Sequence, residues 1–213
     1  MTTTTVRLLD LGHITRPAHE WGGPHGRVEP VLAYLVRHAR GSLLFDTGIG
    51  AGSPETDAHY RPVRRPLPVR PGDVDLVVNC HLHFDHIGGN PALAGTPVLV
   101  QRKELATARA GGYTLDALLD GVRYEEVDGE HGIAPGVRIV PTPGHTEGHQ
   151  SLFVDQGDRV TVLAGQAYDF AHEFGVPHHP WLGRLAELAD GRPASVLFAH
   201  DRARREGVLP PPR

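Results

Sequence analysis

The sequence has only one cysteine, Cys80, among its 213 residues, which excludes a disulfide framework within the chain. No segment approaches the roughly 20 apolar residues that a membrane-spanning helix needs, and residues 1–7 lack the apolar core of a secretory signal. The formal charge of −4 and the pI near 6.4 give no basic footprint for nucleic acid or for an anionic membrane. We therefore expect a soluble, cytoplasmic protein with no nucleic-acid or membrane partner.

The length of the chain favours a single domain spanning 1–213, long enough to bury an ordinary core. We expect 202–213 to be a frayed tail, because the chain is proline-rich from Leu209 onward. Residues 12–30 read as an ordered loop, and 50–72 are rich in Pro and Arg without periodicity. Apolar runs predict strands at 6–11, 31–37, 42–45, 74–80, 96–100, 122–127, 137–140, 151–154, 159–164 and 195–199, and helical spacing predicts helices at 102–110, 113–119 and 181–190.

The densest group of chemically active side chains follows the apolar run at 74–80. His81, His83, Asp85 and His86 form an H-x-H-x-D-H pattern directly after this run. Side chains two apart share one face of an extended backbone, so His81 and His83 can bind the same ion. Asp85 and His86 can face a neighbouring point, and imidazole with carboxylate suits zinc and other first-row divalent metals. The alternative is a histidine-rich surface loop, which the spacing and the preceding strand disfavour.

Cys80 directly precedes this group, which invites its assignment as a further ligand. Successive side chains on a strand face opposite ways, so Cys80 should point away from His81 and into the packing of the sheet. We expect a buried, small apolar residue at this position.

The run His81-Leu82-His83-Phe84-Asp85-His86 resembles the signature of the metallo-β-lactamase superfamily, and its wording is closest to the quorum-quenching N-acyl-homoserine lactone lactonase branch. Further matching segments occur in the right order at 43–48, 98–102, 141–151 and 198–201. The resemblance covers most of the chain. It implies an α/β fold of the metallo-β-lactamase type, a four-layer αββα sandwich with metals between the two sheets.

The resemblance also implies a zinc centre. A first zinc ion would bind to His81, His83 and His145, and a second to Asp85, His86 and His200. In dinuclear members an aspartate bridges both ions, but this chain has Gln166 at that position. An amide oxygen is neutral and a weaker ligand than a carboxylate, so we expect one firm zinc site and a weakened second one. Asp169 lies three residues too late to be a good substitute.

Two other residues have supporting roles in the resembling families. Asp46 would accept a hydrogen bond from a metal-binding imidazole, which orients the ring; it can at the same time cap backbone amides in its turn. His149 is not a ligand in the family, and we treat it as structural.

The leading hypothesis is a metal-dependent hydrolase that opens a lactone or related ester of a small-molecule substrate. A bound metal lowers the pKa of its water toward about 7, so that hydroxide is available at neutral pH. Asp85 would take up the proton and return it to the leaving alkoxide. Tyr168 would donate a hydrogen bond to the oxyanion, although a purely packing role is an equal alternative. Candidate apolar walls for an acyl chain are Phe84, Ile49, Phe170 and Trp181.

Two other readings remain open. One is a thioesterase similar to hydroxyacylglutathione hydrolase, or a β-lactamase. The other is a catalytically degenerate metal-binding sensor or accessory protein, suggested by Gln166. The sequence does not determine the oligomeric state.

Overall fold

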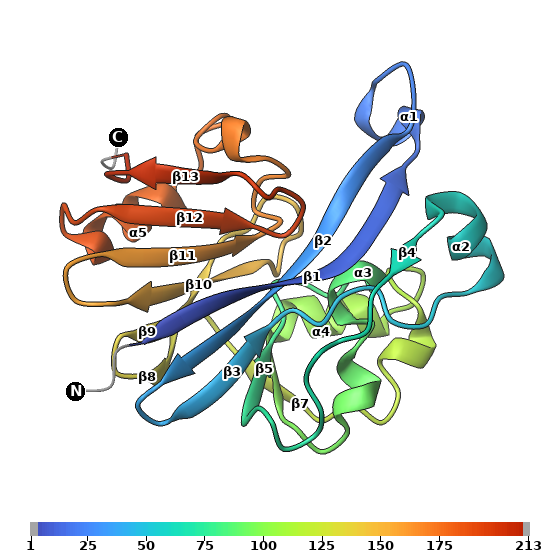
Figure 1. Ribbon diagram of the computed structural model, residues 1–213, viewed down its shortest axis with the longest axis horizontal. Coiled ribbons are helices and arrows are strands. Elements are labelled where there is room, and N and C mark those ends of the chain that lie inside the picture. Colours follow the sequence, from blue (N-terminus) through green and yellow to red (C-terminus); the bar gives the residue numbers. More distant parts are fainter. Residues whose placement is uncertain (1–3, 211–213) are drawn as a thin grey trace.

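Two β-sheets face each other and carry helices on their outer sides in the computed structural model, which describes residues 4–210 (Figure 1). The first sheet has the order β4-β1-β2-β3-β5-β6-β7, and the second has the order β13-β12-β11-β10-β9-β8. The strands of the first sheet are β1 (Thr5–Arg16), β2 (Arg27–His38), β3 (Gly41–Phe45), β4 (Val63–Arg64), β5 (Leu76–Val78), β6 (Val98–Gln101) and β7 (Tyr124–Val127). Those of the second are β8 (His131–Ala134), β9 (Val137–Pro141), β10 (Gln150–Asp155), β11 (Val160–Gly165), β12 (Ala194–Phe198) and β13 (Arg204–Gly207).

The helices are short. They are α1 (Ala18–Trp21), α2 (Pro54–Tyr60), α3 (Phe84–Ile87), α4 (Arg102–Arg109) and α5 (Trp181–Ala189), with 3₁₀ turns at Asn90–Leu93, Asp116–Leu118 and Ala171–Glu173. Within 4–210, no helix has the length and apolar character required to cross a membrane.

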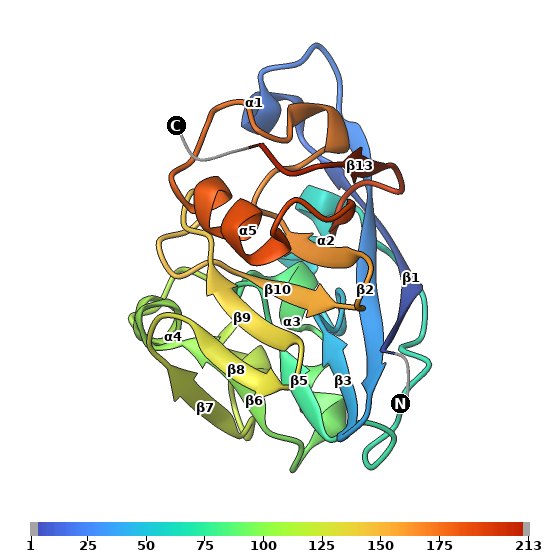
Figure 2. The same cartoon turned by 90° about the vertical axis from the view of Figure 1, so that its left-hand side faces the viewer.

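The core lies in three apolar layers, which confirms the expected four-layer αββα arrangement. Between the sheets, side chains such as Tyr34 and Phe45 pack against Ile139 and Leu152. The Tyr34 hydroxyl also donates to the carbonyl of Phe198, 2.7 Å away, and so ties the first sheet to the second. On the outer face of the second sheet, α5 packs its apolar side against the strands (Figure 2). On the outer face of the first sheet, α4 does the same.

The loops that follow β5, β11 and β12 meet at one edge of the sandwich. β11 and β12 are parallel, so their carboxyl ends lie side by side. Ala199 donates from its backbone to Gly165, 2.8 Å away, and joins the loops after these two strands. Gln150 donates from its backbone to Cys80, 2.8 Å away, and joins the loop after β5 to the second sheet. Sites in α/β proteins gather at such strand ends.

The expectation of a loop at 12–30 is wrong. β1 continues to Arg16 and β2 begins at Arg27, so the two strands form a long hairpin that carries α1 at its far end (Figure 1). The pairing shifts register between Asp10 and His13. This bulge interrupts the alternation of side chains, which is why the sequence pattern stops near residue 11.

The expectation of a frayed tail at 202–213 is also wrong for its described part. β13 pairs with β12 as an antiparallel edge strand, and Leu209 is buried. An edge strand with charged side chains carries no apolar pattern, because its backbone hydrogen bonds supply the pairing. Residues 211–213 lie outside the described part of the chain. That 1–213 forms a single domain stays a prediction.

Three smaller differences concern secondary structure. The helix expected at 113–119 is only the 3₁₀ turn Asp116–Leu118. The aperiodic region 50–72 contains α2 and β4, and the short strand β8 follows β7 without having been expected. Short elements of two to seven residues give too few periods to be recognised from a sequence.

Candidate metal centre

Three imidazoles from two segments meet at the end of β5. His81 lies in the loop after β5, His83 directly precedes α3, and His145 comes from the loop between β9 and β10. His83 Nδ1 lies 2.8 Å from His81 Nε2 and 3.2 Å from His145 Nε2. Two imidazole nitrogens at this distance repel each other if both carry lone pairs. A cation between the three rings can instead accept one lone pair from each ring. The arrangement has the donor set of a zinc site with an open position.

A second group lies beside the first. The Nε2 atoms of His86 and His200 are 3.2 Å apart, and Asp85 Oδ2 lies 3.5 Å from His200 Nε2 and 3.8 Å from His86 Nε2. His200 Nδ1 lies 2.9 Å from the carbonyl oxygen of Pro30. A carbonyl only accepts, so this contact places the proton of His200 on Nδ1 and leaves the Nε2 lone pair facing the group. The structure therefore brings together all six residues that the family resemblance selected.

Asp46 orients this second group through hydrogen bonds. Its Oδ2 accepts from His86 Nδ1 at 3.0 Å and its Oδ1 accepts from the backbone N–H of Cys80 at 2.8 Å. The first contact fixes the His86 proton on Nδ1 and points Nε2 toward Asp85 and His200. Asp46 has a φ of +62°, in the left-handed region that aspartate tolerates better than most residues.

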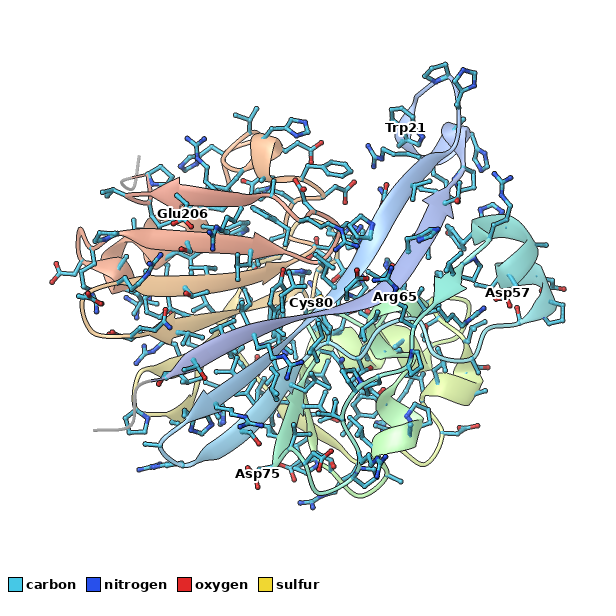
Figure 3. All side chains as sticks on the ribbon, in the orientation of Figure 1. Trp21, Asp57, Arg65, Asp75, Cys80 and Glu206 are labelled. Atoms are coloured by element: carbon cyan, nitrogen blue, oxygen red, sulfur yellow. The ribbon has the colours of Figure 1, made fainter. Side chains whose placement is uncertain are left out.

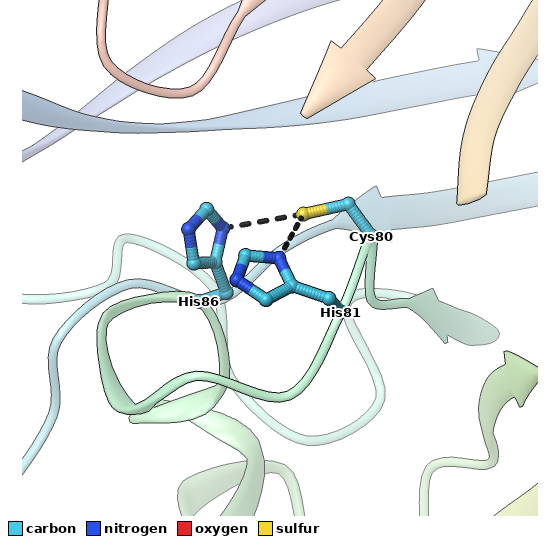
Figure 4. Close-up of side chains that lie close together, drawn as sticks. All are labelled: Cys80, His81 and His86. Carbon is cyan, nitrogen blue, oxygen red and sulfur yellow. Dashed lines mark hydrogen bonds between the residues drawn. The ribbon is translucent and has the colours of Figure 1, made fainter. Parts of the chain in front are cut away.

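The expected orientation of Cys80 is wrong, although its burial is as expected. Cys80 Sγ lies 3.1 Å from His81 Nδ1 and 3.3 Å from His86 Nδ1, and so points toward both rings (Figure 4). β5 ends at Val78, so the alternation of a strand no longer applies at residue 80. Burial raises the pKa of the Cys80 thiol well above its usual range, so it stays protonated. It contacts the nitrogens that face away from the two metal-binding groups.

Gln166 presents its amide oxygen to the second group. Gln166 Oε1 lies 3.2 Å from His86 Nε2, and Gln166 Nε2 donates to Asp169 Oδ1 at 2.9 Å. The other oxygen of Asp169 pairs with Arg16 at 2.7 Å and with Arg27 at 3.3 Å. Asp169 is therefore occupied by two guanidinium groups and an amide, and this geometry gives no support to Asp169 as a replacement for the bridging carboxylate.

The electrostatics of the two groups differ. Burial lowers the pKa of His83 to about 4 and that of His145 to about 3, so both are neutral at pH 7, the state in which imidazole binds a metal. Burial also disfavours charge on His86, but the carboxylates of Asp85 and Asp46 outweigh it and raise the pKa of His86 to about 9. Burial alone would raise the pKa of Asp85, and the surrounding imidazoles His86, His200 and His83 lower it instead. The second group thus favours a positive charge at its centre.

Tyr168 does not take the place expected of an oxyanion donor. Its hydroxyl donates to the carbonyl of Pro177 at 2.6 Å, and its ring packs against Phe174 and Trp181. Trp181 in turn donates to the carbonyl of Pro143 at 2.9 Å and belongs to the core under α5. These contacts agree with the packing alternative for Tyr168.

His149 has the geometry of a structural residue. It is fully buried, its Nδ1 lies 2.8 Å from the Thr142 hydroxyl, and its Nε2 accepts from the backbone N–H of Gln166 at 3.2 Å. Both nitrogens are thus engaged by residues that directly follow strands of the second sheet, Thr142 after β9 and Gln166 after β11.

A cavity of about 430 Å³ opens over the two groups. It reaches four of the site residues, namely His83, Asp85, His145 and Gln166. Sequence reasoning missed five residues of its walls, namely Ile14, Arg16, Glu20, Tyr60 and Tyr113. Arg16 and Tyr60 come from regions without a recognisable pattern, so no signal in the sequence pointed to them.

Phe84 is the expected apolar residue that lines this cavity. Its ring lies 5.0 Å from that of Tyr60, and it packs against the clusters that contain Ile49 and Leu118. Ile49 and Leu118 line a second, mostly apolar cavity of about 790 Å³. Phe170 is placed differently, with the Arg27 guanidinium 4.4 Å from its ring centre.

The fold and the six converging side chains agree with one family. The chain belongs to the metallo-β-lactamase superfamily, whose family model matches residues 26–199. Within it, the chain is similar to N-acyl homoserine lactonases, as the sequence of its H-x-H-x-D-H motif predicts. One from Bacillus sp. is 30% identical over 209 residues and 84% of each chain. The lactonase AiiA from Bacillus thuringiensis subsp. kurstaki is 28% identical over 203 residues and 81% of each chain.

Solved structures agree with this assignment of the fold. A B. thuringiensis AiiA mutant with N-decanoyl-L-homoserine bound at its active site superimposes with a TM-score of 0.79, at 23% identity over 95% of each chain. An N-acyl homoserine lactone hydrolase with N-hexanoyl-L-homoserine bound at its catalytic metal centre gives a TM-score of 0.77, at 22% identity over 95% of each chain.

Proposed function

We propose that the protein is a zinc-dependent hydrolase that opens a lactone or a related ester of a small molecule. The observation that carries the proposal is the convergence of six ligand atoms, in two adjacent groups, at a cavity large enough for a small substrate. The lactone is proposed because the named relatives are N-acyl homoserine lactonases. The cytoplasmic location stays a prediction.

The residues present fit zinc in number and type. His81, His83 and His145 would hold the ion of the firm site, since three neutral imidazoles are a common catalytic donor set. Asp85, His86 and His200 would hold a second ion, with the neutral oxygen of Gln166 in place of a bridging carboxylate. Zinc at this centre would supply Lewis-acid activation of water and of the substrate carbonyl.

Asp85 is the residue we assign to proton transfer. It lines the cavity, and its lowered pKa keeps it ionised at neutral pH. A carboxylate in this position can accept the proton of the attacking water and return it to the leaving alkoxide. His200 and His86 lie within 3.5 Å and 3.8 Å of its Oδ2 and hold it beside the ligand groups.

The cavity combines apolar and cationic surface. Phe84 and Ile14 provide apolar contact for an acyl group, and Arg16 is the basic residue of its lining. Arg16 is paired with Asp169 and Glu29, so its charge is largely balanced. We infer that an uncharged ester with an apolar substituent fits this lining better than a strongly anionic substrate.

A second candidate function is a metal-binding protein without turnover, and the observation in its favour is Gln166. Bridging two divalent ions normally relies on a negative charge, and the amide that faces His86 has none. Thioester hydrolysis remains an alternative within the same site chemistry.

The test is a substrate panel combined with metal analysis. Purified wild type is assayed on lactones of increasing acyl length, thioesters and β-lactams, and its zinc content per chain is measured. We expect lactone turnover that His83→Ala abolishes. Zinc-loaded wild type that turns over no member of the panel would overturn the proposal.

Two variants of one residue separate hydrolase from degenerate protein. Gln166→Asp supplies the bridging charge. Gln166→Asn introduces a side chain of the same length as aspartate but without the charge. If the degenerate reading is right, only Gln166→Asp gains a second zinc and activity. If wild type is already active, both variants bind zinc at the first group, and Gln166→Asn is at most as active as wild type.

A further inference from the structure

A second cluster of metal-binding side chain types lies outside the centre described above. His19 and Glu20 belong to α1, at the tip of the β1–β2 hairpin, and His59 belongs to α2. One ligand atom from each of the three lies within 4.8 Å of the others. Trp21 and Asp57, labelled in Figure 3, mark these two helices. The cluster thus joins segments that are about forty residues apart in the chain.

The three side chains face one another across the gap between the helices. His59 Nε2 lies 2.5 Å from Glu20 Oε1, and the ring centres of His19 and His59 are 5.8 Å apart. The side chains of His59 and Glu20 are 42% and 27% exposed, so an ion from solvent can reach them and they can adjust around it.

Both helices are held in place by local contacts. Ser53 caps α2, accepting from the backbone of Thr56 at 3.1 Å. Trp21 at the end of α1 donates to the carbonyl of His25 at 3.0 Å, and the Arg27 guanidinium lies 4.7 Å from its ring. The cluster is therefore presented by two defined elements, which favours binding because little order has to be imposed.

We propose that His19, Glu20 and His59 form an exposed site for a divalent transition metal that bridges α1 and α2. Two imidazoles and one carboxylate favour zinc, nickel or copper over magnesium or calcium, which prefer oxygen ligands. The remaining positions on the ion are open to water. In the absence of metal, the same atoms form the His59–Glu20 contact.

The site lies at the mouth of the cavity over the metal centre. Glu20 itself lines that cavity, and so does Tyr60, the neighbour of His59. The Tyr60 ring packs at 4.5 Å on His59 and at 5.0 Å on Phe84. An ion that bridges the helices therefore fixes two residues of the cavity rim. This role does not depend on which substrate the centre turns over.

Zinc stoichiometry tests the proposal without any activity assay. Metal-free wild type, His19→Ala and His59→Ala are titrated with zinc by calorimetry. We expect wild type to bind one equivalent more than either variant, whatever number the buried centre holds. His172→Ala is the matched control, since His172 is 79% exposed and lies 4.0 Å from a glutamate without a second imidazole. We expect it to bind as wild type.

Hydrogen exchange tests the bridge itself. With zinc added, amides of 17–26 and 54–60 should exchange more slowly in wild type and not in His59→Ala. Equal zinc stoichiometry in wild type and both alanine variants would overturn the site. An extra equivalent that leaves exchange in both segments unchanged would overturn the bridging role. Circular dichroism of the variants, whose replaced side chains are exposed, checks that they are folded.

Discussion

Replacing Asp46 by asparagine is expected to lower the zinc affinity of the second group, made by Asp85, His86 and His200, more than that of the first. The carboxylate accepts two hydrogen bonds, from His86 Nδ1 at 3.0 Å and from the backbone of Cys80 at 2.8 Å. An amide has one oxygen, so Asp46→Asn leaves one of these donors facing an NH₂ group. Asparagine tolerates the positive φ at this position, so the backbone itself is not strained.

The magnitude follows from the bond that is lost. A hydrogen bond to a charged group contributes about 1.5–3 kcal/mol. If the amide oxygen stays on Cys80, His86 must move its proton to Nε2, the atom that faces Asp85 and His200. Loss of such an orienting partner typically costs about 10–100-fold in metal affinity. We expect this loss at the second group and little change at the group of His81, His83 and His145.

Zinc affinity is measured by competition with a chromogenic chelator, which resolves a tight and a weak class of sites. The matched control is Asp75→Asn, because Asp75 also accepts a backbone N–H, from Ser42 at 2.8 Å, but on an exposed part of the chain. Zinc affinities of Asp46→Asn that stay within about twofold of wild type for both classes would refute the reasoning that Asp46 orients His86.

Three further outcomes follow. His83→Ala should remove the zinc of the first group and all hydrolysis, because His83 Nδ1 contacts both other imidazoles; elemental analysis and a lactone assay check this, and full activity would count against the centre. Tyr168→Phe should leave kcat unchanged and lower the free energy of unfolding by about 0.5–1.5 kcal/mol, because the hydroxyl donates to Pro177; urea denaturation measures it, and a large loss of kcat would restore a catalytic role. In the metal-free chain, prepared with a chelator, burial holds the pKa of His83 at about 4 and that of His145 at about 3. Below pH 6.5 these imidazoles therefore bind protons in the unfolded chain but not in the folded one. Thermal stability of the metal-free chain should therefore fall as the pH drops from 6.5 toward 4, and a melting temperature constant over that window would contradict it.

Four of the candidate ligands could be predicted from the residues alone, because the pattern that marks them is local. The H-x-H-x-D-H run follows a buried strand, and its spacing alone selects His81, His83, Asp85 and His86. His145 and His200 needed the family resemblance, since a single histidine after a turn has no distinguishing pattern. The strands β11 and β12 could also be predicted from the sequence, because buried parallel strands carry continuous apolar side chains.

The features that the sequence did not predict depend on tertiary contacts or on an interrupted side-chain periodicity. Cys80 was misplaced because β5 ends two residues earlier than the apolar run suggests. Arg16 reaches the cavity only because the β1–β2 hairpin continues past a bulge, and Tyr60 only because α2 folds over the site. β13 is recognised by its pairing with β12 and by nothing in its own charged side chains.

The ligand set is divided between the two sheets. The loop after β5 belongs to the first sheet, whereas His145 and His200 come from loops of the second. Neither half of the chain holds a complete set of candidate ligands before the sandwich has closed, so zinc binding at the proposed centre would be linked to the docking of the two halves. Free zinc should then slow the separation of the sheets, and the lifetime of the native chain would depend on the zinc concentration of the surrounding solution.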